Sequence, residues 1–317
     1  MPKIAKSNHR RPNRKTLILA AAALLVFTAV ALVERAQKKR HASAAVTLTQ
    51  SAAEPPRPWI ISLLPSVTET IYMLGLGDHL IARSQYCDFP PVVTNLPIVG
   101  SLGAANIEAI ARLKPDYVLL PQLDSQSKAH EALAKLRINH IGIPANSFDD
   151  IVQSIWDLAK RFDAEENATL WLEHINDLTA QIKAKPPRRT PRVLFCAGRD
   201  AGSFDRIYIS GAGNFYEDVV NRCGGANAYT GKLSTPMLSA EGVIKANPDI
   251  IIDVLINANT IDIAEALEQW SRLATVNAIR TGDVHILNDP WAARPGPRID
   301  TLMQTIAAFI HEWDEKQ

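Results

Sequence analysis

The sequence predicts an α/β protein in which two lobes, each built on parallel strands, are joined by one long helix. Three observations support this fold class. Short apolar runs alternate with helical patterns from Pro58 onward, residues 163–185 contain neither Gly nor Pro, and one short pattern occurs twice. Apolar runs that are separated by helices indicate parallel strands buried on both faces of a sheet.

The length and composition are those of an ordinary globular protein. The 317 residues allow about two domains, and 47% of them are hydrophobic while 21% are charged. These values exclude a chain that is disordered throughout, a collagen-like chain and a disulfide scaffold. A polytopic membrane protein is excluded as well, because only one stretch is long and apolar enough to span a bilayer.

Charge is distributed unevenly along the chain. Residues 1–40 contain ten basic residues and one acidic residue, a net charge of +9, and the remainder contains 24 basic and 32 acidic residues, a net charge of −8. An acidic body does not attract the phosphate backbone of a nucleic acid. We therefore expect no nucleic-acid partner.

The N-terminal segment 1–40 is interpreted as a signal or a membrane anchor. Six basic residues precede the apolar run Leu17–Val33, which is the pattern of an export signal. The run is near the lower length limit of a spanning helix. A small-residue cleavage site at 42–44 is separated from the run by the charged residues 34–40, which favour an anchor. We expect an uncleaved anchor or a slowly cleaved signal, followed by a linker over 41–57 and a body outside the cytoplasm.

Eight apolar runs are predicted as strands, four before the long helix and four after it. They are Trp59–Leu64, Leu80–Arg83, Tyr117–Leu120, His140–Ile143, Val193–Cys196, Ile207–Ile209, Ile250–Val254 and Val284–Leu287. The long helix lies between these two groups and therefore connects two lobes. The predicted parts are an N-terminal lobe over 58–162, a connecting helix over 163–186 and a C-terminal lobe over 187–317.

Helix boundaries are marked by short polar signals. Ser66–Glu69 has the spacing of a capping box directly after the first strand, and Gly75 ends that helix. Asp163–Glu166 opens the connecting helix, and Pro186 with Pro187 ends it. Such a helix is about 30 Å long, the diameter of a small domain.

A weak internal repeat matches one part of each lobe. The segment that starts at Asn106 and contains Glu108 recurs as the segment that starts at Ser239 and contains Glu241. In both copies Pro-Asp follows the Glu after seven residues and an apolar run comes next. A Glu in a first helical turn complements the helix dipole. Helix capping alone explains such residues, but two matched surface carboxylates would also form a symmetric docking pair.

The loops that follow the strands supply the candidates for a ligand site, because ligands collect at the carboxyl ends of parallel strands. Aromatic and arginine side chains occur there between Gly and Pro residues, notably Tyr86, Tyr208, Trp291 and Arg294. Such residues suit a large planar or anionic ligand. Simple packing of the loops is the alternative for Tyr86 and Trp291.

Catalytic and metal motifs are missing from the sequence. It has no Gly-x-Ser-x-Gly elbow and no Walker loop, and Gly211–Tyr216 matches a dinucleotide fingerprint at two glycines only. The eight histidines form no His-x-x-x-His pair. We expect neither a catalytic residue nor a resident metal or cofactor. Cys87, Cys196 and Cys223 favour three buried free thiols over one disulfide with one free thiol.

From about Trp59 to Trp313 the chain resembles the class III, or helical-backbone, substrate-binding proteins that serve ABC importers of vitamin B12 and ferric siderophores. The motifs that carry this resemblance are Ile61–Glu69, Leu74–Gly77, Tyr86–Pro90, Asn106–Glu108 with Leu113–Asp116, Cys223–Asn227 and Arg294–Arg298. Each motif is weak alone, and the set is specific. The resemblance implies two Rossmann-like lobes joined by one long backbone helix, a ligand between the lobes and a monomeric chain. It also implies that Glu108 and Glu241 meet arginines of the permease subunits.

Within this family the chain is most similar to vitamin B12-binding proteins. The resemblance implies that Tyr86, Tyr208, Trp291 and Arg294 contact the ligand, and that Leu102 and Thr235 replace two family aromatics. Cys223 matches a family cysteine that forms a disulfide in some members, but residues 305–311 lack its partner. The ligand is expected to be a corrinoid such as cobalamin, with a ferric siderophore or haem as alternatives.

An enzyme and a membrane-anchored sensor are the alternatives to a protein that binds a ligand and delivers it to an importer. An enzyme such as a hydrolase or reductase on a two-lobed scaffold would need a nucleophile–base pair or a metal cluster, and the sequence contains neither motif. A membrane-anchored sensor would need a cytoplasmic output domain, but only 16 residues precede the apolar run. Binding is therefore the expected function.

Overall fold

A computed structural model describes residues 58–101, 104–122, 128–199, 203–255 and 262–317. The apolar run 17–33, the linker 41–57 and Leu102 lie outside these ranges, so the predictions on them stay predictions. Within the described ranges, no helix combines the length and the apolar character needed to cross a membrane.

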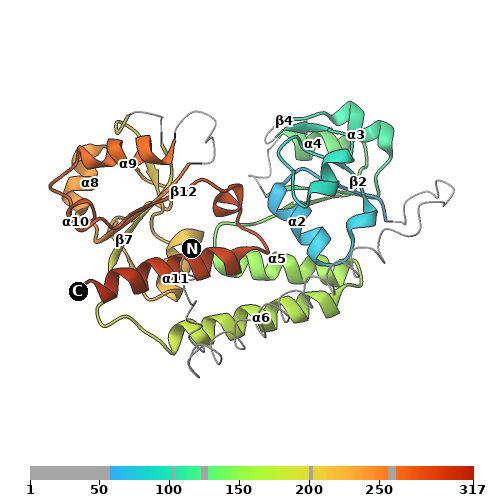
Figure 1. The fold of residues 1–317 in the computed structure, drawn as a ribbon. Coiled ribbons are helices and arrows are strands. Elements are labelled where there is room, and N and C mark those ends of the chain that lie inside the picture. Colours follow the sequence, from blue (N-terminus) through green and yellow to red (C-terminus); the bar gives the residue numbers. More distant parts are fainter. Residues whose placement is uncertain (1–57, 102–103, 123–127, 200–202, 256–261) are drawn as a thin grey trace, which may run out of the picture. The chain divides into compact units, whose positions relative to one another are not determined.

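The N-terminal sheet consists of four parallel strands in the order β2-β1-β5-β6. It belongs to the part of the chain coloured blue to green in Figure 1. Its strands are β1 (Ile60–Ser62), β2 (Leu80–Arg83), β5 (Tyr117–Pro121) and β6 (His140–Ile143). A short hairpin of β3 (Gly100–Ser101) and β4 (Ala104–Ala105) stands apart from this sheet. The helices of this half are α2 (Pro65–Met73), α3 (Ile107–Leu113) and α4 (Lys128–Lys135), with the short 3₁₀ helices η1 (Gly77–His79) and η2 (Pro91–Asn95).

The C-terminal sheet is mixed. Strands β7 (Arg192–Arg199), β11 (Ile250–Val254), β12 (Val284–Leu287) and β9 (Ala226–Asn227) pair in parallel, whereas β8 (Ile207–Ile209) and β10 (Met237–Leu238) are antiparallel. Its helices are α7 (Phe215–Arg222), α8 (Ala240–Ala246), α9 (Ile263–Ser271), α10 (Asn277–Thr281) and the 3₁₀ helix η3 (Pro290–Ala293). The α/β fold class is confirmed, with an antiparallel edge that the sequence did not predict.

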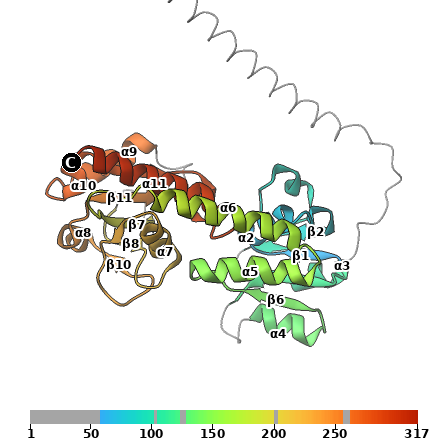
Figure 2. The same ribbon diagram turned by 90° about the horizontal axis from the view of Figure 1, so that it is seen from below.

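Three long helices run beside the sheets. They are α5 (Phe148–Arg161), α6 (Glu165–Lys183) and the C-terminal α11 (Ile299–Glu315), and α6 contacts both of the others (Figures 1 and 2). Helix α6 has 19 residues and is therefore about 28 Å long, as predicted for the connecting helix. It begins two residues later than Asp163, and its N-cap residue Ala164 makes no side-chain hydrogen bond.

One apolar core extends through both halves of the described chain. It contains Leu119 of β5, Phe195 of β7 and Ile252 of β11 together with side chains of α5, α6, α7 and α11. Each fully buried Leu, Ile or Phe contributes about 1.5–3 kcal/mol of hydrophobic stabilisation. The three long helices thus join the two sheets through a shared core. We keep the proposed division, in which 58–162 is the N-terminal lobe, 163–186 the connecting helix and 187–317 the C-terminal lobe.

All eight predicted strands are present, but the predicted capping box at Ser66–Glu69 is wrong. Helix α2 begins at Pro65 after Leu64, whose side chain cannot cap, and Ser66 is already inside the helix. The side chain of Glu69 is buried and binds Arg294 and Arg298 instead of the helix start. The favoured state of the cysteines is confirmed, since Cys87, Cys196 and Cys223 are all buried and free.

Candidate functional site

The loop after β2 is built around the side chain of Arg83. Its guanidinium is buried and donates to the carbonyls of Cys87 (3.0 Å), Ser84 (3.2 Å) and Thr94 (3.0 Å). These bonds hold the loop 84–95 in one shape because a buried guanidinium must satisfy its donors. Tyr86 projects from this loop with 50% of its surface exposed.

The loop after β12 carries the second aromatic candidate. Asp289 caps the 3₁₀ helix η3, since its Oδ1 accepts from the backbone N–H of Trp291 at 3.2 Å. The Trp291 ring is half-buried and packs against the shared core. The following segment 294–298 leads into α11. Trp291 therefore stands on a backbone that is fixed on both sides.

Arg294 joins these two loops. Its two Nη atoms donate to the carboxylate of Asp88 at 2.6 and 3.0 Å, and Nη2 also reaches the carbonyl of Tyr86 at 3.4 Å. The hydrogen bonds from Arg294 lower the pKa of Asp88. Burial alone would lower the pKa of Arg294, but the bonds to Asp88 and Glu69 outweigh it and raise that pKa. The structure thus links the loops of Tyr86 and Trp291 through Arg294.

Tyr208 lies in β8, a strand of the C-terminal sheet. It is 42% exposed and pairs with Met237 of β10, which is exposed as well, as is Leu233 four residues before Met237. Thr235 is exposed between Leu233 and Met237. No hydrogen bond or ring contact joins Tyr208 to Tyr86 or Trp291 among the described residues. Each lobe therefore presents its own exposed aromatic side chain.

The matched glutamates stand at the same position of two similar helices. Glu108 is in the first turn of α3 and Glu241 is in the first turn of α8, and both side chains are exposed. Glu108 forms an ion pair with Arg112, whereas Glu241 accepts a hydrogen bond from the Ser239 hydroxyl at 2.6 Å. That bond lowers the pKa of Glu241, which is ionised at neutral pH.

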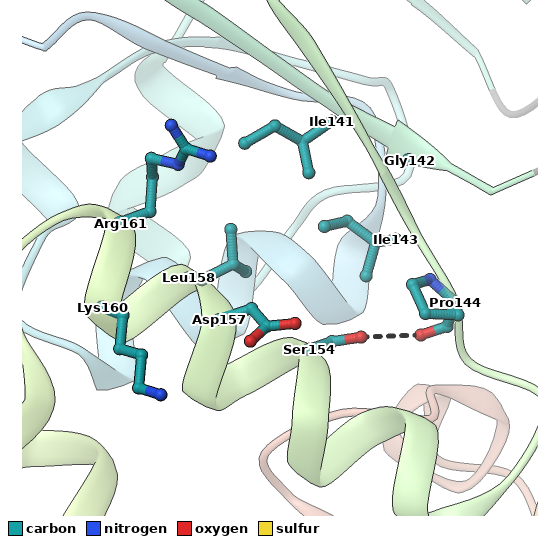
Figure 3. Close-up of a pocket in the computed structure, with 9 residues that line it drawn as sticks. All are labelled: Ile141, Gly142, Ile143, Pro144, Ser154, Asp157, Leu158, Lys160 and Arg161. Atoms are coloured by element: carbon teal, nitrogen blue, oxygen red, sulfur yellow. Dashed lines mark hydrogen bonds between the residues drawn. The ribbon is translucent and has the colours of Figure 1, made fainter.

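A hollow of about 570 Å³ lies elsewhere, between the edge strand β6 and helix α5 (Figure 3). Its lining includes Ile141, Asp157, Lys160 and Arg161, and none of the predicted site residues. Ser154 on its rim donates to the carbonyl of Pro144 at 3.0 Å. The hollow has no aromatic ring in its lining, so it offers no flat face to a planar ligand. The aromatic loops are the better candidate site.

The described part of the chain offers few side chains for metal binding or for nucleophilic catalysis. No group of three His, Cys, Asp or Glu side chains there could hold a metal ion. Burial raises the pKa of the Cys223 thiol to about 12, and burial also raises that of Cys196. Thiols with raised pKa values are poor nucleophiles at neutral pH.

Sequence reasoning missed three residues of this region. Phe89 is exposed in the same loop as Tyr86, Met237 is exposed and pairs with Tyr208, and Arg83 shapes the first loop. Phe89 carried a detectable signal, because it is the second aromatic of the same Pro-terminated loop. Arg83 ends an ordinary apolar run, and nothing in its neighbourhood indicates that its charge is buried.

The comparisons with known proteins agree with one another. Residues 60–290 match the family described as periplasmic binding protein. A vitamin B12-binding protein of Pectobacterium atrosepticum is 31% identical over 260 residues, which cover 80% of this chain and 88% of that protein.

Solved structures of periplasmic binding proteins also align with the chain. The periplasmic vitamin B12 binding protein of Vibrio cholerae aligns with a TM-score of 0.66 and 27% identity over 82% of this chain and 98% of that one. A periplasmic heme-binding protein of Vibrio cholerae aligns with a TM-score of 0.69 over 80% of this chain and 98% of that one. At 20% identity, the latter likeness concerns the fold alone.

Proposed function

Since the chain belongs to the periplasmic binding protein family, a family of substrate-binding proteins and not of enzymes, we propose that it binds a corrinoid such as cobalamin and delivers it to an ABC importer. The observation that carries the ligand class is the 31% identity to a vitamin B12-binding protein across 80% of the chain. The exposed Tyr86 and the half-buried Trp291, on loops that Arg294 joins, supply flat apolar faces that suit a corrin ring.

The proposed ligand site is formed by Tyr86, Leu102, Tyr208, Thr235 and Trp291, together with Arg294, which joins two of the loops. Large aromatic side chains contribute about 1.5–3 kcal/mol each when a ligand covers them fully. The replacement of two family aromatics by Leu102 and Thr235 reduces the stacking area, so affinity depends more strongly on the three aromatics that remain.

Fluorescence titration of the full-length protein with cyanocobalamin tests this ligand. Trp291 stacked on a corrin should lose emission, and Trp291→Phe should remove most of that loss while retaining binding. Tyr86→Ala should weaken binding about tenfold or more. Trp156→Phe on α5 is the matched control and should leave the quenching unchanged. Saturating cyanocobalamin that leaves the emission of the unaltered protein and its melting temperature unchanged would remove the corrinoid from the proposal.

The proposed partner is an ABC permease that Glu108 and Glu241 bind, one from each lobe. Both carboxylates are exposed at the start of a seven-residue helix, where they can accept bidentate bonds from arginine. The double variant Glu108→Ala/Glu241→Ala should retain ligand affinity and lose uptake. Normal uptake by this variant would exclude the docking role and leave helix capping as the function of both residues.

The proposed location is outside the cytoplasm, with residues 17–33 as an anchor or slowly cleaved signal in the inner membrane. The basic residues before the apolar run support this orientation. A reporter enzyme that works only after export should be active when fused at Gln317. Membrane fractionation then separates an anchor from a cleaved signal. We expect a monomer, which light scattering on the purified protein measures.

A further inference from the structure

Residues 294–298 belong to the C-terminal lobe in sequence, but their side chains bind the N-terminal lobe. Arg298 donates to the carboxylate of Glu69 in α2 through Nε at 2.8 Å and Nη2 at 2.6 Å. Arg294 donates to the same carboxylate at 3.1 Å and binds Asp88 with both Nη atoms. The Glu69 side chain is only 2% exposed. We call these four residues, Glu69, Asp88, Arg294 and Arg298, the interlobe clasp.

Backbone and ring contacts hold the same segment in place. A Cβ on Gly296 would lie 2.8 Å from the Cβ of Ser66 in α2, which is too close for any other residue. The indole N–H of Trp171 in α6 donates to the carbonyl of Pro297 at 2.8 Å. The guanidinium of Arg298 lies over the Phe89 ring at 4.2 Å. The clasp is therefore attached to α2, to α6 and to the loop of Tyr86.

The charges of the clasp cancel one another. Two arginines face two carboxylates, and the side chain of Arg294 is only 12% exposed. Its Nη atoms already have protein acceptors, namely Glu69, Asp88 and the Tyr86 carbonyl. An anionic ligand could bind the Nη atoms of this guanidinium only by displacing Asp88, Glu69 or the Tyr86 carbonyl. Removing an ion-pair partner from a buried charge is costly.

We propose that Arg294 is a positioning residue that acts through Asp88, holding Tyr86 and Trp291 in one fixed arrangement before the ligand arrives, and that its guanidinium does not bind the ligand. This inference rests on the proposed function for the identity of the ligand, and it changes the role that the sequence suggested for Arg294. A preformed site needs no ordering of its loops on binding, which lowers the entropic cost of association.

A double-mutant cycle in ligand affinity separates positioning from contact. The probe is cyanocobalamin, and the variants are Asp88→Ala, Arg294→Gln and the combination of both. If Arg294 acts through Asp88, each single variant weakens binding about tenfold and the double variant binds no more weakly than the weaker single one. If Arg294 contacts the ligand directly, Asp88→Ala leaves affinity unchanged or raises it, and Arg294→Gln costs the same in both backgrounds. That second pattern would overturn the inference.

Asp149→Asn supplies the matched control. Asp149 of α5 forms an exposed ion pair with Arg222 of α7, so it also links the two lobes, but it contacts neither aromatic loop. It should leave the affinity unchanged. An equal loss of affinity in Asp149→Asn would show that any weakened interlobe contact has this effect, and it would also overturn the specific role of Arg294.

Hydrogen exchange without ligand tests the clasp even if the corrinoid proposal fails. In the full-length protein, the amides of residues 84–90 should exchange several-fold faster in Arg294→Gln and in Asp88→Ala than in the unaltered protein, whereas β1 amides should not change. Unchanged exchange at 84–90 would refute the clasp whatever the ligand is. Faster exchange together with no cyanocobalamin binding by the unaltered protein would retain the clasp and reject only the ligand.

Discussion

The two lobes contain the same structural unit, and its contacts are repeated at a constant separation of 133 residues. In the N-terminal lobe the backbone N–H of Trp59 donates to Asp116 at 2.7 Å, and in the C-terminal lobe that of Arg192 donates to Asp249 at 2.9 Å. The strand registers agree as well, because β1 pairs with β5 as β7 pairs with β11. The helices α3 and α8 both end in a residue with a left-handed backbone.

The side chains of the two copies differ where the backbones agree. Leu120 of β5 is matched by Asp253 of β11. Glu108 is matched by Glu241, but Glu108 forms an ion pair with Arg112, whereas Lys245, which matches Arg112, forms no ion pair in the described residues. The backbone of the unit is thus set by strand pairing and capping, which many sequences satisfy. The buried charges and the partners of the surface carboxylates differ between the two copies, and substitutions between matched positions test what each difference does.

The largest effect is expected from Asp253→Leu, which installs the residue of the matched position. Asp253 and Arg199 form a fully buried ion pair at 2.8 Å, and the Trp270 N–H donates to the same carboxylate at 2.8 Å. The variant leaves the Arg199 charge buried without its partner, so we expect a loss of about 3–5 kcal/mol of unfolding free energy in urea. Arg199→Met/Asp253→Leu should recover most of it. A loss below about 1 kcal/mol in the single variant would contradict this account.

The next effect concerns the docking pair. Glu108 must give up its ion pair with Arg112 before it binds a permease arginine, whereas Glu241 gives up only a bond from a neutral serine. Glu241→Ala should therefore reduce uptake more than Glu108→Ala, and Arg112→Ala should raise permease affinity through Glu108. Uptake and permease binding, measured for all three variants alongside melting temperature, decide the order. Equal losses of uptake in Glu108→Ala and Glu241→Ala would show that the partners of the two glutamates do not affect docking.

A smaller effect is expected from the helix caps. The Asn106 side chain accepts from the N–H of Ala109 at 3.0 Å, whereas Ser239 makes no side-chain cap bond. Asn106→Ala should cost about 1 kcal/mol of unfolding free energy, and Ser239→Ala should cost much less. Urea denaturation of both variants measures the difference. A larger loss for Ser239→Ala would mean that its bond to Glu241, and not capping, stabilises α8.

The smallest effect is a pH dependence that His285 of the C-terminal sheet contributes. His285 of β12 stands where β6 has Ile141, its ring stacks on Phe309, and burial lowers its pKa. The unfolded chain then binds a proton that the folded chain does not, so stability falls as the pH drops below about 6.5. His285→Ile should flatten the dependence of the melting temperature on pH between roughly pH 7.5 and pH 5.5, which is about one pH unit on either side of the reference histidine pKa. An unchanged slope would assign the dependence to other groups.

Features that a single strand or turn determines could be predicted from the sequence. Ile250–Val254 and the other buried strands are apolar runs, and the repeat around Glu108 and Glu241 is local in both copies. The fold class and the connecting helix follow from such signals. The loops of Tyr86 and Trp291 follow predicted strands, and the structure brings these two loops together through Arg294.

Features that depend on distant partners could not be predicted. Glu69 has the spacing of a capping residue, and its actual partners Arg294 and Arg298 are 225 and 229 residues away. The strand of Tyr208 is apolar like the others, and only its pairing shows that it is antiparallel. Local sequence sets a propensity, but a charge that is buried by tertiary contacts leaves no local signal.

Equilibrium dialysis of the full-length protein against equal concentrations of cyanocobalamin, haem and a ferric siderophore tests the central claim most directly. The account predicts that cyanocobalamin alone is enriched, at one molecule per chain, and that Tyr86→Ala/Trp291→Ala abolishes the enrichment while the double variant stays folded. Enrichment of haem or of the siderophore in preference to cyanocobalamin would contradict it.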